Sequence, residues 1–339
     1  MSLSHTERLH ACLSDDPVLD RPPVALWRHF PVDDQHPETL AAATLGFQRQ
    51  WDFDLVKVTP ASSFSIKDWG AEDVWEGHSE GTRRYTRRVI QSPLDWERLP
   101  VLSPSAPHLA GQLVCLRLIR AGLLTETPLL QTVFSPLAQA KNLAGGDVLI
   151  AHLRQYPEAV LKGLETIAKS TRQFVEACLE TGIDGIFYAV QHAQAGLLTR
   201  DEFRSFGLVH DRMVLEPARS LWCNLLHLHG LNVYFDLLPS YSSLFTSPLI
   251  VNWHDRETPP SLAEAQTSEG TPVLCGGVSQ HSIVFADSSR VREEAEDAIK
   301  QTKGRRFILG TGCVVPVIAP YGNIQAVVGA AHTSHLREK

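Results

Sequence analysis

Two histidines separated by one residue are the strongest candidates for metal chemistry in this sequence. They lie in Leu225-Leu226-His227-Leu228-His229-Gly230, ahead of an apolar run. If this segment is a buried strand, alternate side chains share a face, so His227 and His229 point the same way. Two imidazoles on one face can bind one metal ion. Two hydrogen-bonded histidines in the polar end of a barrel explain the same pattern equally well.

A distant cysteine favours the metal interpretation. The segment Phe307-Ile308-Leu309-Gly310-Thr311-Gly312-Cys313 predicts a strand that runs into a glycine-flanked thiol. A Cys313 thiolate would complete a zinc site with His227 and His229 and leave one coordination position open, which distinguishes a catalytic from a structural zinc. Because imidazoles donate less charge than thiolates, such a metal would polarise a carboxylate, carbonyl or water as readily as it activates a thiol.

Length and composition predict one ordinary globular domain spanning residues 1–339. The chain has 43% apolar and 20% charged residues and a net charge of −7, which argues against a nucleic-acid surface. Its six cysteines form no CxxC pairs, and no signal peptide opens the chain. No apolar run reaches the ~18 residues of a membrane span. We therefore expect a cytoplasmic protein that contacts neither nucleic acid nor membrane.

The elements that must position these ligands predict a barrel. Eight strand-like segments, near residues 24, 54, 129, 185, 225, 249, 273 and 307, are mostly separated by helical segments. This order predicts an α/β fold of the (β/α)8 TIM-barrel type, with an irregular excursion around residues 60–128 that covers the site and contains a hairpin near Glu80-Gly81. A doubly wound open sheet is the alternative, but no GxGxxG follows any strand.

Polar residues gather where the predicted strands end, which is where barrel enzymes place their active sites. We assign catalytic roles to Arg28, Lys57, His192 and Asp255, and substrate contacts to His29, Tyr188, Gln191, Asn252, His254 and Gln280. His192 has a structural alternative as a hydrogen-bonded histidine of the barrel mouth. Asp255 either orients an imidazole or belongs to a solvated loop ion pair with its neighbours.

Several short motifs are spread over nearly the whole chain. They are Arg21-Pro22-Pro23-Val24 with Arg28, Asp184-Gly185, Ala195-Gly196-Leu197-Leu198 with Phe203, Asn252-Trp253, Gly276-Gly277-Val278, and Gly312-Cys313-Val314-Val315-Pro316 with Asn323-Ile324. Together they resemble the uroporphyrinogen decarboxylase superfamily. That resemblance implies a (β/α)8 barrel and two enzyme branches: cofactor-free porphyrinogen decarboxylases, and zinc-dependent methyltransferases that work with thiols or corrinoid carriers.

Departures from the family pattern separate the two branches. The decarboxylases carry Arg-Gln-Ala-Gly-Arg after the first strand, whereas this chain reads Arg28-His29-Phe30-Pro31. Lys57-Val58-Thr59 stands where the decarboxylases have an aspartate that holds the pyrrole nitrogens. The zinc methyltransferases carry a His-x-Cys pair and a later cysteine, and His227-Leu228-His229 with Cys313 matches that layout with one cysteine replaced by histidine.

The sequence is therefore compatible with three functions. The favoured one is a zinc-dependent methyltransferase acting on a small methylated compound, with a thiol or a corrinoid on a separate protein as its partner. The second is a cofactor-free decarboxylase, with Arg28 binding a carboxylate of the substrate through two hydrogen bonds. The third is a non-catalytic ligand-binding barrel. The sequence leaves the oligomeric state open, a homodimer included.

Overall fold

A parallel sheet forms the centre of the protein. The computed structural model describes residues 2–123, 126–266 and 272–334. Each strand pairs in parallel with the next in the order β1-β4-β5-β6-β7-β8-β9. The strands are β1 (Val56–Val58), β4 (Leu129–Phe134), β5 (Gly185–Val190), β6 (Leu225–Leu228), β7 (Ile250–Trp253), β8 (Val273–Val278) and β9 (Phe307–Thr311).

A short segment around Val24 closes this sheet into a barrel. Val24 forms a parallel bridge with Leu309 of β9, and Ala25 N donates to Leu309 O at 2.9 Å. On the other side, Asp54 N donates to Val24 O at 2.9 Å, just before β1. The first of the eight predicted strands, near residue 24, is thus reduced to a bridge. The (β/α)8 prediction is confirmed, with a strand or bridge at all eight expected places.

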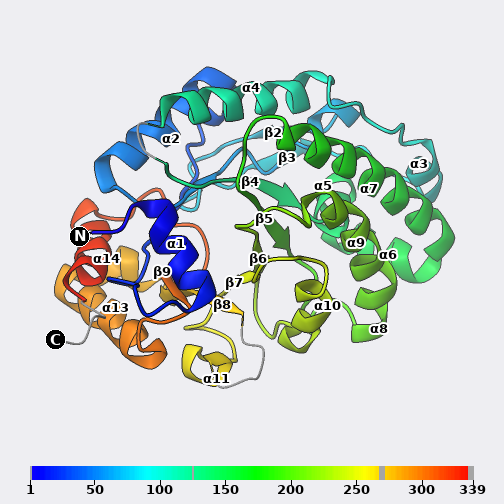
Figure 1. Ribbon diagram of the computed structural model, residues 1–339. Coiled ribbons are helices and arrows are strands. Elements are labelled where there is room, and N and C mark those ends of the chain that lie inside the picture. Colours follow the sequence, from blue (N-terminus) through cyan, green and yellow to red (C-terminus); the bar gives the residue numbers. More distant parts are fainter. Residues whose placement is uncertain (1, 124–125, 267–271, 335–339) are drawn as a thin grey trace.

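Helices surround the sheet (Figure 1). Burial of one helical face explains this packing: in α7, for example, Val160, Leu164 and Ile167 are fully buried at intervals of four and three. The longer helices are α2 (Pro37–Trp51), α4 (Pro107–Gly122), α6 (Gly146–Gln155), α7 (Pro157–Leu179), α13 (Ser288–Thr302) and α14 (Tyr321–Thr333). The shorter ones are α3 (Pro93–Arg98), α5 (Pro136–Ala144), α8 (Arg200–Phe203), α9 (Val209–Leu215), α10 (Leu238–Ser242), α11 (Leu262–Gln266) and α12 (Ser282–Phe285).

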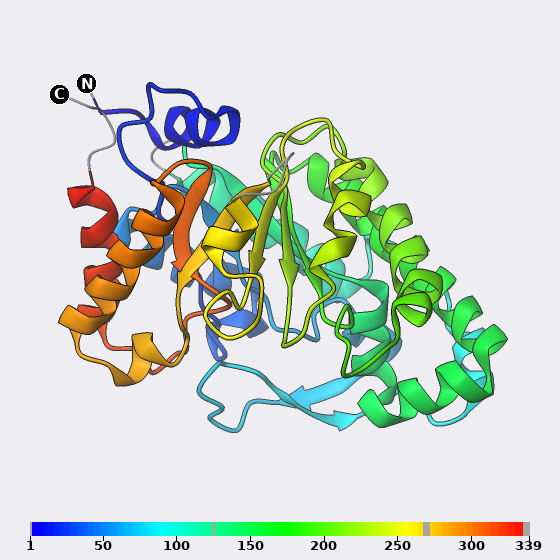
Figure 2. The same cartoon turned by 90° about the horizontal axis from the view of Figure 1, so that it is seen from below.

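The two ends of the barrel are covered differently. Helix α1 (His5–Ser14) lies at the amino ends of the strands, where Cys12 Sγ contacts Phe307 O at 3.5 Å. The antiparallel hairpin of β2 (Glu72–Val74) and β3 (Arg84–Arg87) lies beyond the carboxyl ends of the strands (Figure 2). The predicted hairpin is therefore present and stands on the side where the candidate site was expected.

The segment 60–128 is more regular than predicted. It contains α3 and the sixteen-residue helix α4, which packs along α2. The signal was present, because Pro107 opens the helix and Leu109, Leu113 and Leu116 repeat at helical intervals. The surrounding prolines and charges obscured this pattern.

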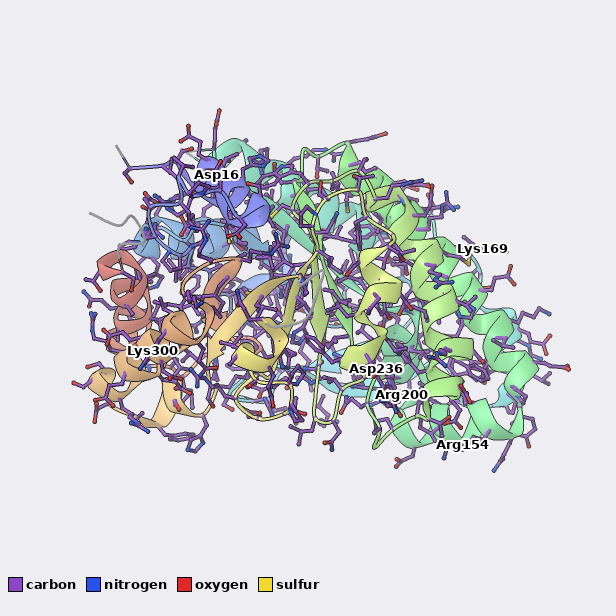
Figure 3. The ribbon with its side chains drawn as sticks, turned by 60° about the horizontal axis from the view of Figure 1, so that its bottom comes forward. Asp16, Arg154, Lys169, Arg200, Asp236 and Lys300 are labelled. Atoms are coloured by element: carbon purple, nitrogen blue, oxygen red, sulfur yellow. The ribbon has the colours of Figure 1, made fainter. Side chains whose placement is uncertain are left out.

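The outer surface carries exposed ion pairs. Arg200 and Asp236, for example, form two hydrogen bonds of 3.0 Å at the periphery (Figure 3). None of the described helices is long and apolar enough to cross a membrane.

A buried ion network secures the place where the barrel closes. Asp54 is fully buried, and its carboxylate accepts from Arg8 Nη1 at 2.7 Å, Arg21 Nη1 at 2.7 Å and Val24 N at 2.8 Å. Because Arg8 belongs to α1 and Val24 to the closing bridge, one carboxylate joins the amino-terminal helix to the barrel. Its loss would leave Arg21 without its ion pair among the described residues and would leave Arg8 with Asp20 alone.

We expect Asp54→Ala to lower the free energy of unfolding by about 3–5 kcal/mol, the usual cost of stranding buried charges. Urea unfolding followed by circular dichroism measures this loss. The matched control is Asp236→Ala, which removes an exposed pair worth about 0–1 kcal/mol. Equal losses in the two variants would show that the Asp54 network does not stabilise the closure.

Candidate metal centre

Four side chains from three strand ends converge at the carboxyl end of the barrel. They are His227 and His229 at the end of β6, His254 directly after β7, and Cys313 two residues after β9. Their ligand atoms all lie within 4.8 Å of one another. The structure thus joins His254, which the sequence assigned to substrate, to the three predicted metal ligands. The expectation of an open coordination position is corrected, because a fourth side chain lies where that position was expected.

Four of the six separations between these atoms match those around a tetrahedral ion, and the other two are at most 4.8 Å. His229 Nδ1 lies 3.4 Å from His227 Nε2 and 3.5 Å from His254 Nε2. Cys313 Sγ lies 3.6 Å from His227 Nε2 and 3.7 Å from His229 Nδ1. A tetrahedral zinc with bonds of about 2.05 Å to nitrogen and about 2.3 Å to sulfur separates two nitrogens by about 3.3 Å and nitrogen from sulfur by about 3.6 Å. The donor set therefore fits zinc, with three imidazoles and one thiolate.

Asn252 fixes the orientation of His227. The amide Nδ2 of Asn252 donates to Cys275 O at 2.9 Å and to Thr311 O at 3.0 Å, so its Oδ1 is left to accept from His227 Nδ1 at 2.6 Å. His227 then carries its proton on Nδ1 and directs the lone pair of Nε2 into the cluster. Asn252 is fully buried and positions a ligand, so the predicted substrate contact is replaced by a structural one.

Glu257 does the same for His254. Its Oε2 lies 3.3 Å from His254 Nδ1, which leaves Nε2 for the cluster. The sequence assigned this orienting role to Asp255. That assignment is corrected, because the Asp255 carboxylate is buried and accepts from Gly277 N at 3.1 Å. Burial raises the pKa of Asp255 to about 7.

Burial keeps the imidazoles in the neutral form that binds metals. It lowers the pKa of His229 to about 4 and that of His227 well below its usual value. Burial also raises the pKa of Cys313 to about 12. A dication bound to this sulfur favours the thiolate, so metal binding would release a proton from Cys313.

Two further buried residues, Lys57 and His29, lie near the cluster. Lys57 Nζ sits 4.5 Å from the centre of the Phe187 ring, which stacks on His227 at 5.4 Å. Its one hydrogen bond within the described residues goes to Thr59 Oγ1 at 3.2 Å, and no carboxylate there pairs with it. Burial lowers the pKa of Lys57 to about 7. Burial, followed by the charge of Lys57, lowers the pKa of His29 to about 3, and His29 Nδ1 has no hydrogen-bond partner in the described structure.

Two predicted site residues lie elsewhere. Tyr188 points away from the barrel interior and donates its hydroxyl to Asp211 Oδ1 at 2.6 Å. The predicted substrate contact is corrected: Phe187 faces His227, and neighbouring strand residues face opposite sides. Arg28 donates to Val317 O at 3.0 Å and lies 5.7 Å from the Phe30 ring, which joins it to the loop after β9 rather than to the four ligands.

The remaining predicted contacts line the barrel mouth. Gln191 Oε1 accepts from Lys141 Nζ at 3.3 Å, and Gln280 Nε2 donates to Val314 O at 2.6 Å. His192 is buried, and its Nδ1 has no partner among the described residues. Burial lowers its pKa to about 3, with smaller contributions from Lys141 and His229. His192 therefore stands beside the cluster without belonging to it.

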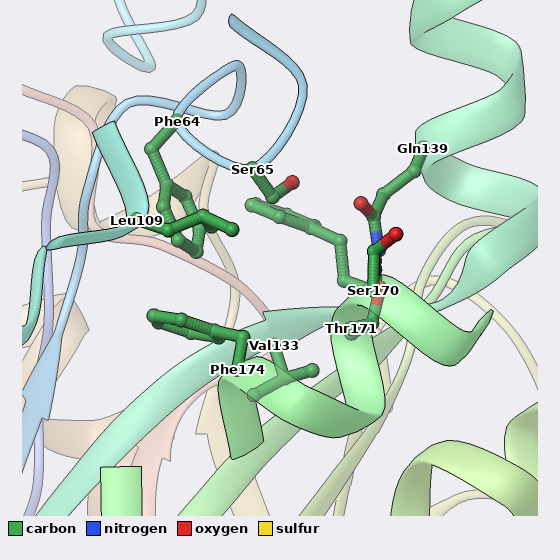
Figure 4. Close-up of a pocket in the computed structure, with 9 residues that line it drawn as sticks. Phe64, Ser65, Leu109, Val133, Gln139, Ser170, Thr171 and Phe174 are labelled. Atoms are coloured by element: carbon green, nitrogen blue, oxygen red, sulfur yellow. Dashed lines mark hydrogen bonds between the residues drawn. The ribbon is translucent and has the colours of Figure 1, made fainter. Parts of the chain in front are cut away.

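A separate small pocket between β4 and α7 does not resemble a substrate site (Figure 4). Its Gln139 donates to Thr171 Oγ1 and to Phe134 O, both at 2.8 Å, and Ser170 accepts from Leu102 N at 3.0 Å. These polar groups are used by the protein itself, and Phe64, Leu109 and Phe174 fill the rest of the lining.

Comparisons with known proteins identify the group to which this fold belongs. The family model described as Uroporphyrinogen decarboxylase (URO-D) matches residues 18–334. No curated protein matches the sequence. Among solved structures, a methyltransferase from Methanosarcina mazei is similar with a TM-score of 0.83 and 18% identity, covering 98% of this chain and 99% of that one. A B12-independent methionine synthase from a Shewanella species matches with a TM-score of 0.60 and 13% identity over 92% and 93% of the two chains. At these identities the structures show a shared fold.

We expect the purified protein to hold about one zinc ion per chain, because four pre-placed ligands form a tight site. Replacing His227, His229 or Cys313 by Ala should remove the ion, as measured by mass spectrometry of the metal after dialysis. His192→Ala is the matched control, since it deletes a neighbouring buried imidazole outside the donor set. Full metal content in Cys313→Ala would remove that sulfur from the site.

A second expectation concerns Asn252. Asn252→Leu removes the acceptor for His227 Nδ1 and should weaken zinc affinity roughly 10–100-fold while the four ligands remain. Competition with a coloured chelator measures the affinity. Unchanged affinity would mean that His227 keeps its orientation without the amide.

Proposed function

The chain belongs to the uroporphyrinogen decarboxylase family, and from that membership we propose that it is a zinc-dependent methyltransferase. Its substrate would be a small methylated compound, and its partner a thiol or a corrinoid carried by a separate protein. The observation that carries the proposal is the convergence of His227, His229, His254 and Cys313. The names of the structural neighbours, one a methyltransferase and one a methionine synthase, support the same class of reaction.

The residues around the centre would each contribute to this chemistry. Because the four side chains would fill a tetrahedral site, a substrate thiol would have to displace one of them; zinc would then lower the pKa of that thiol and so supply a nucleophile for methyl transfer. Asn252 and Glu257 hold two imidazoles in the required orientation. Phe187 covers one face of His227 and excludes water from it. The Lys57 ammonium, which lacks a carboxylate partner among the described residues, would hold an anionic group of the substrate.

Lys57 also argues against porphyrinogen decarboxylation. That reaction needs a negative group facing the pyrrole nitrogens, because the ring becomes cationic when it is protonated. Two like charges about 4 Å apart repel by roughly 4 kcal/mol at an effective dielectric constant of about 20. A cation at Lys57 would therefore raise the barrier of the reaction.

Decarboxylation of another carboxylated substrate is the alternative. The unpaired Lys57 favours it, because a buried cation without a protein counter-ion suits a carboxylate. Arg28 lends it less support than the sequence implied, since its guanidinium is bonded to Val317 O. This reaction would need no metal, which separates the two proposals.

We expect methyl transfer from methylated donors to a thiol or to cob(I)alamin, and we expect a chelator to abolish it and added zinc to restore it. In the same preparation, uroporphyrinogen should give no measurable coproporphyrinogen. Lys57→Met should reduce kcat/KM roughly tenfold or more for anionic substrates while zinc content stays unchanged. Turnover of the porphyrinogen that survives chelation would reverse the assignment in favour of a decarboxylase.

A further inference from the structure

The hairpin over the barrel mouth has a tip bounded by two glycines. Strands β2 and β3 pair with each other and form a sheet apart from the barrel. Between them, Gly77 and Gly81 adopt left-handed backbone conformations with φ of +86° and +81°. A turn between them is closed by Gly81 N, which donates to His78 O at 2.9 Å. Two positions of unusual backbone freedom therefore enclose His78, Ser79 and Glu80.

This tip is seated in the mouth of the barrel. Gly81 is buried against His29, and a Cβ at position 81 would lie 2.4 Å from the Cβ of His29. Ser79 O accepts a hydrogen bond from Val317 N at 2.6 Å. His29 follows the closing bridge, and Val317 lies four residues after the ligand Cys313. The tip thus spans the segments that follow the first and last strands.

The base of the hairpin is held more firmly than the tip. Arg83 Nε donates to Asp73 Oδ1 at 2.8 Å, and Arg83 Nη1 donates to Pro31 O at 2.8 Å. Both charged side chains of this pair are nearly buried. By contrast, among the described residues the tip is joined to the barrel by one backbone hydrogen bond, from Val317 N to Ser79 O, and by the contact of Gly81 with His29.

We propose that residues 77–81 form a lid over the barrel mouth that contains the metal centre, and that the lid is held in place by the contact of Gly81 with His29 and by the hydrogen bond from Val317 N to Ser79 O. This inference deepens the proposed function, because substrate would enter past the lid. Its test requires no turnover, so failure of the lid and failure of methyl transfer are distinguishable.

Alkylation of Cys313 reports whether the lid is seated. The other five cysteines are completely buried, whereas Cys313 is 8% exposed at the centre. The rate is measured with iodoacetamide on the full-length protein, both as purified and after dialysis against a chelator. Loss of the label in Cys313→Ser identifies the reacting thiol.

Gly81→Ala should raise the alkylation rate roughly tenfold or more, since its methyl group cannot fit against His29 while the lid is seated. Gly77→Ala is the matched control, because its φ is also positive but a Cβ there meets no atom within 4 Å. Deletion of residues 78–80 removes the tip and should reproduce the effect if Gly81→Ala folds poorly. Equal rates in Gly81→Ala and Gly77→Ala, or a wild-type rate in the deletion variant, would overturn the lid.

Discussion

The side-chain amide of Asn252 links the strands of the barrel to the metal centre. One amide group on β7 meets the Cys275 carbonyl of β8, the Thr311 carbonyl at the end of β9 and the His227 ring of β6. Because both Nδ2 hydrogens are used by carbonyls, only the oxygen remains for His227, and the tautomer of that ligand follows. The spacing of three strands and the direction of one lone pair therefore depend on the same buried group.

The composition of the donor set decides which chemistry the centre suits. Three neutral imidazoles and one thiolate around a dication leave a net charge of +1, whereas a second thiolate would cancel it. The nearby Lys57 adds a further cation, and burial makes its charge costly unless an anion arrives. The Glu257 carboxylate is paired with His254 instead, at 3.3 Å from its Nδ1. This division of charge favours a substrate with an anionic group placed deep in the barrel.

The periodicity of the sequence predicted the strands and the side chains that share a face. It could not predict which residues of neighbouring strands lie side by side, because that depends on the register of the sheet. Alternation along one strand placed His227 and His229 together, and the succession of strands predicted the barrel. His254 was misassigned because its position depends on the register between β6 and β7. His227 pairs with Asn252, so His229 and His254 lie side by side just beyond the ends of these strands. Tyr188 was misassigned because the sequence does not say which face of a buried strand points inward. Glu257, whose place depends on the loop after β7, was missed because the sequence carries no local signal for its contact with His254.

X-ray absorption at the zinc edge tests the central claim most directly, because it reports the ligands of the bound ion without reference to any reaction. The account predicts three nitrogen ligands at about 2.05 Å and one sulfur ligand at about 2.3 Å in the purified protein. In His254→Ala reconstituted with added zinc, the nitrogen shell should lose imidazole scattering while the sulfur remains. A shell of oxygen and nitrogen without sulfur in the wild-type protein would contradict the account, since it would place the metal away from Cys313.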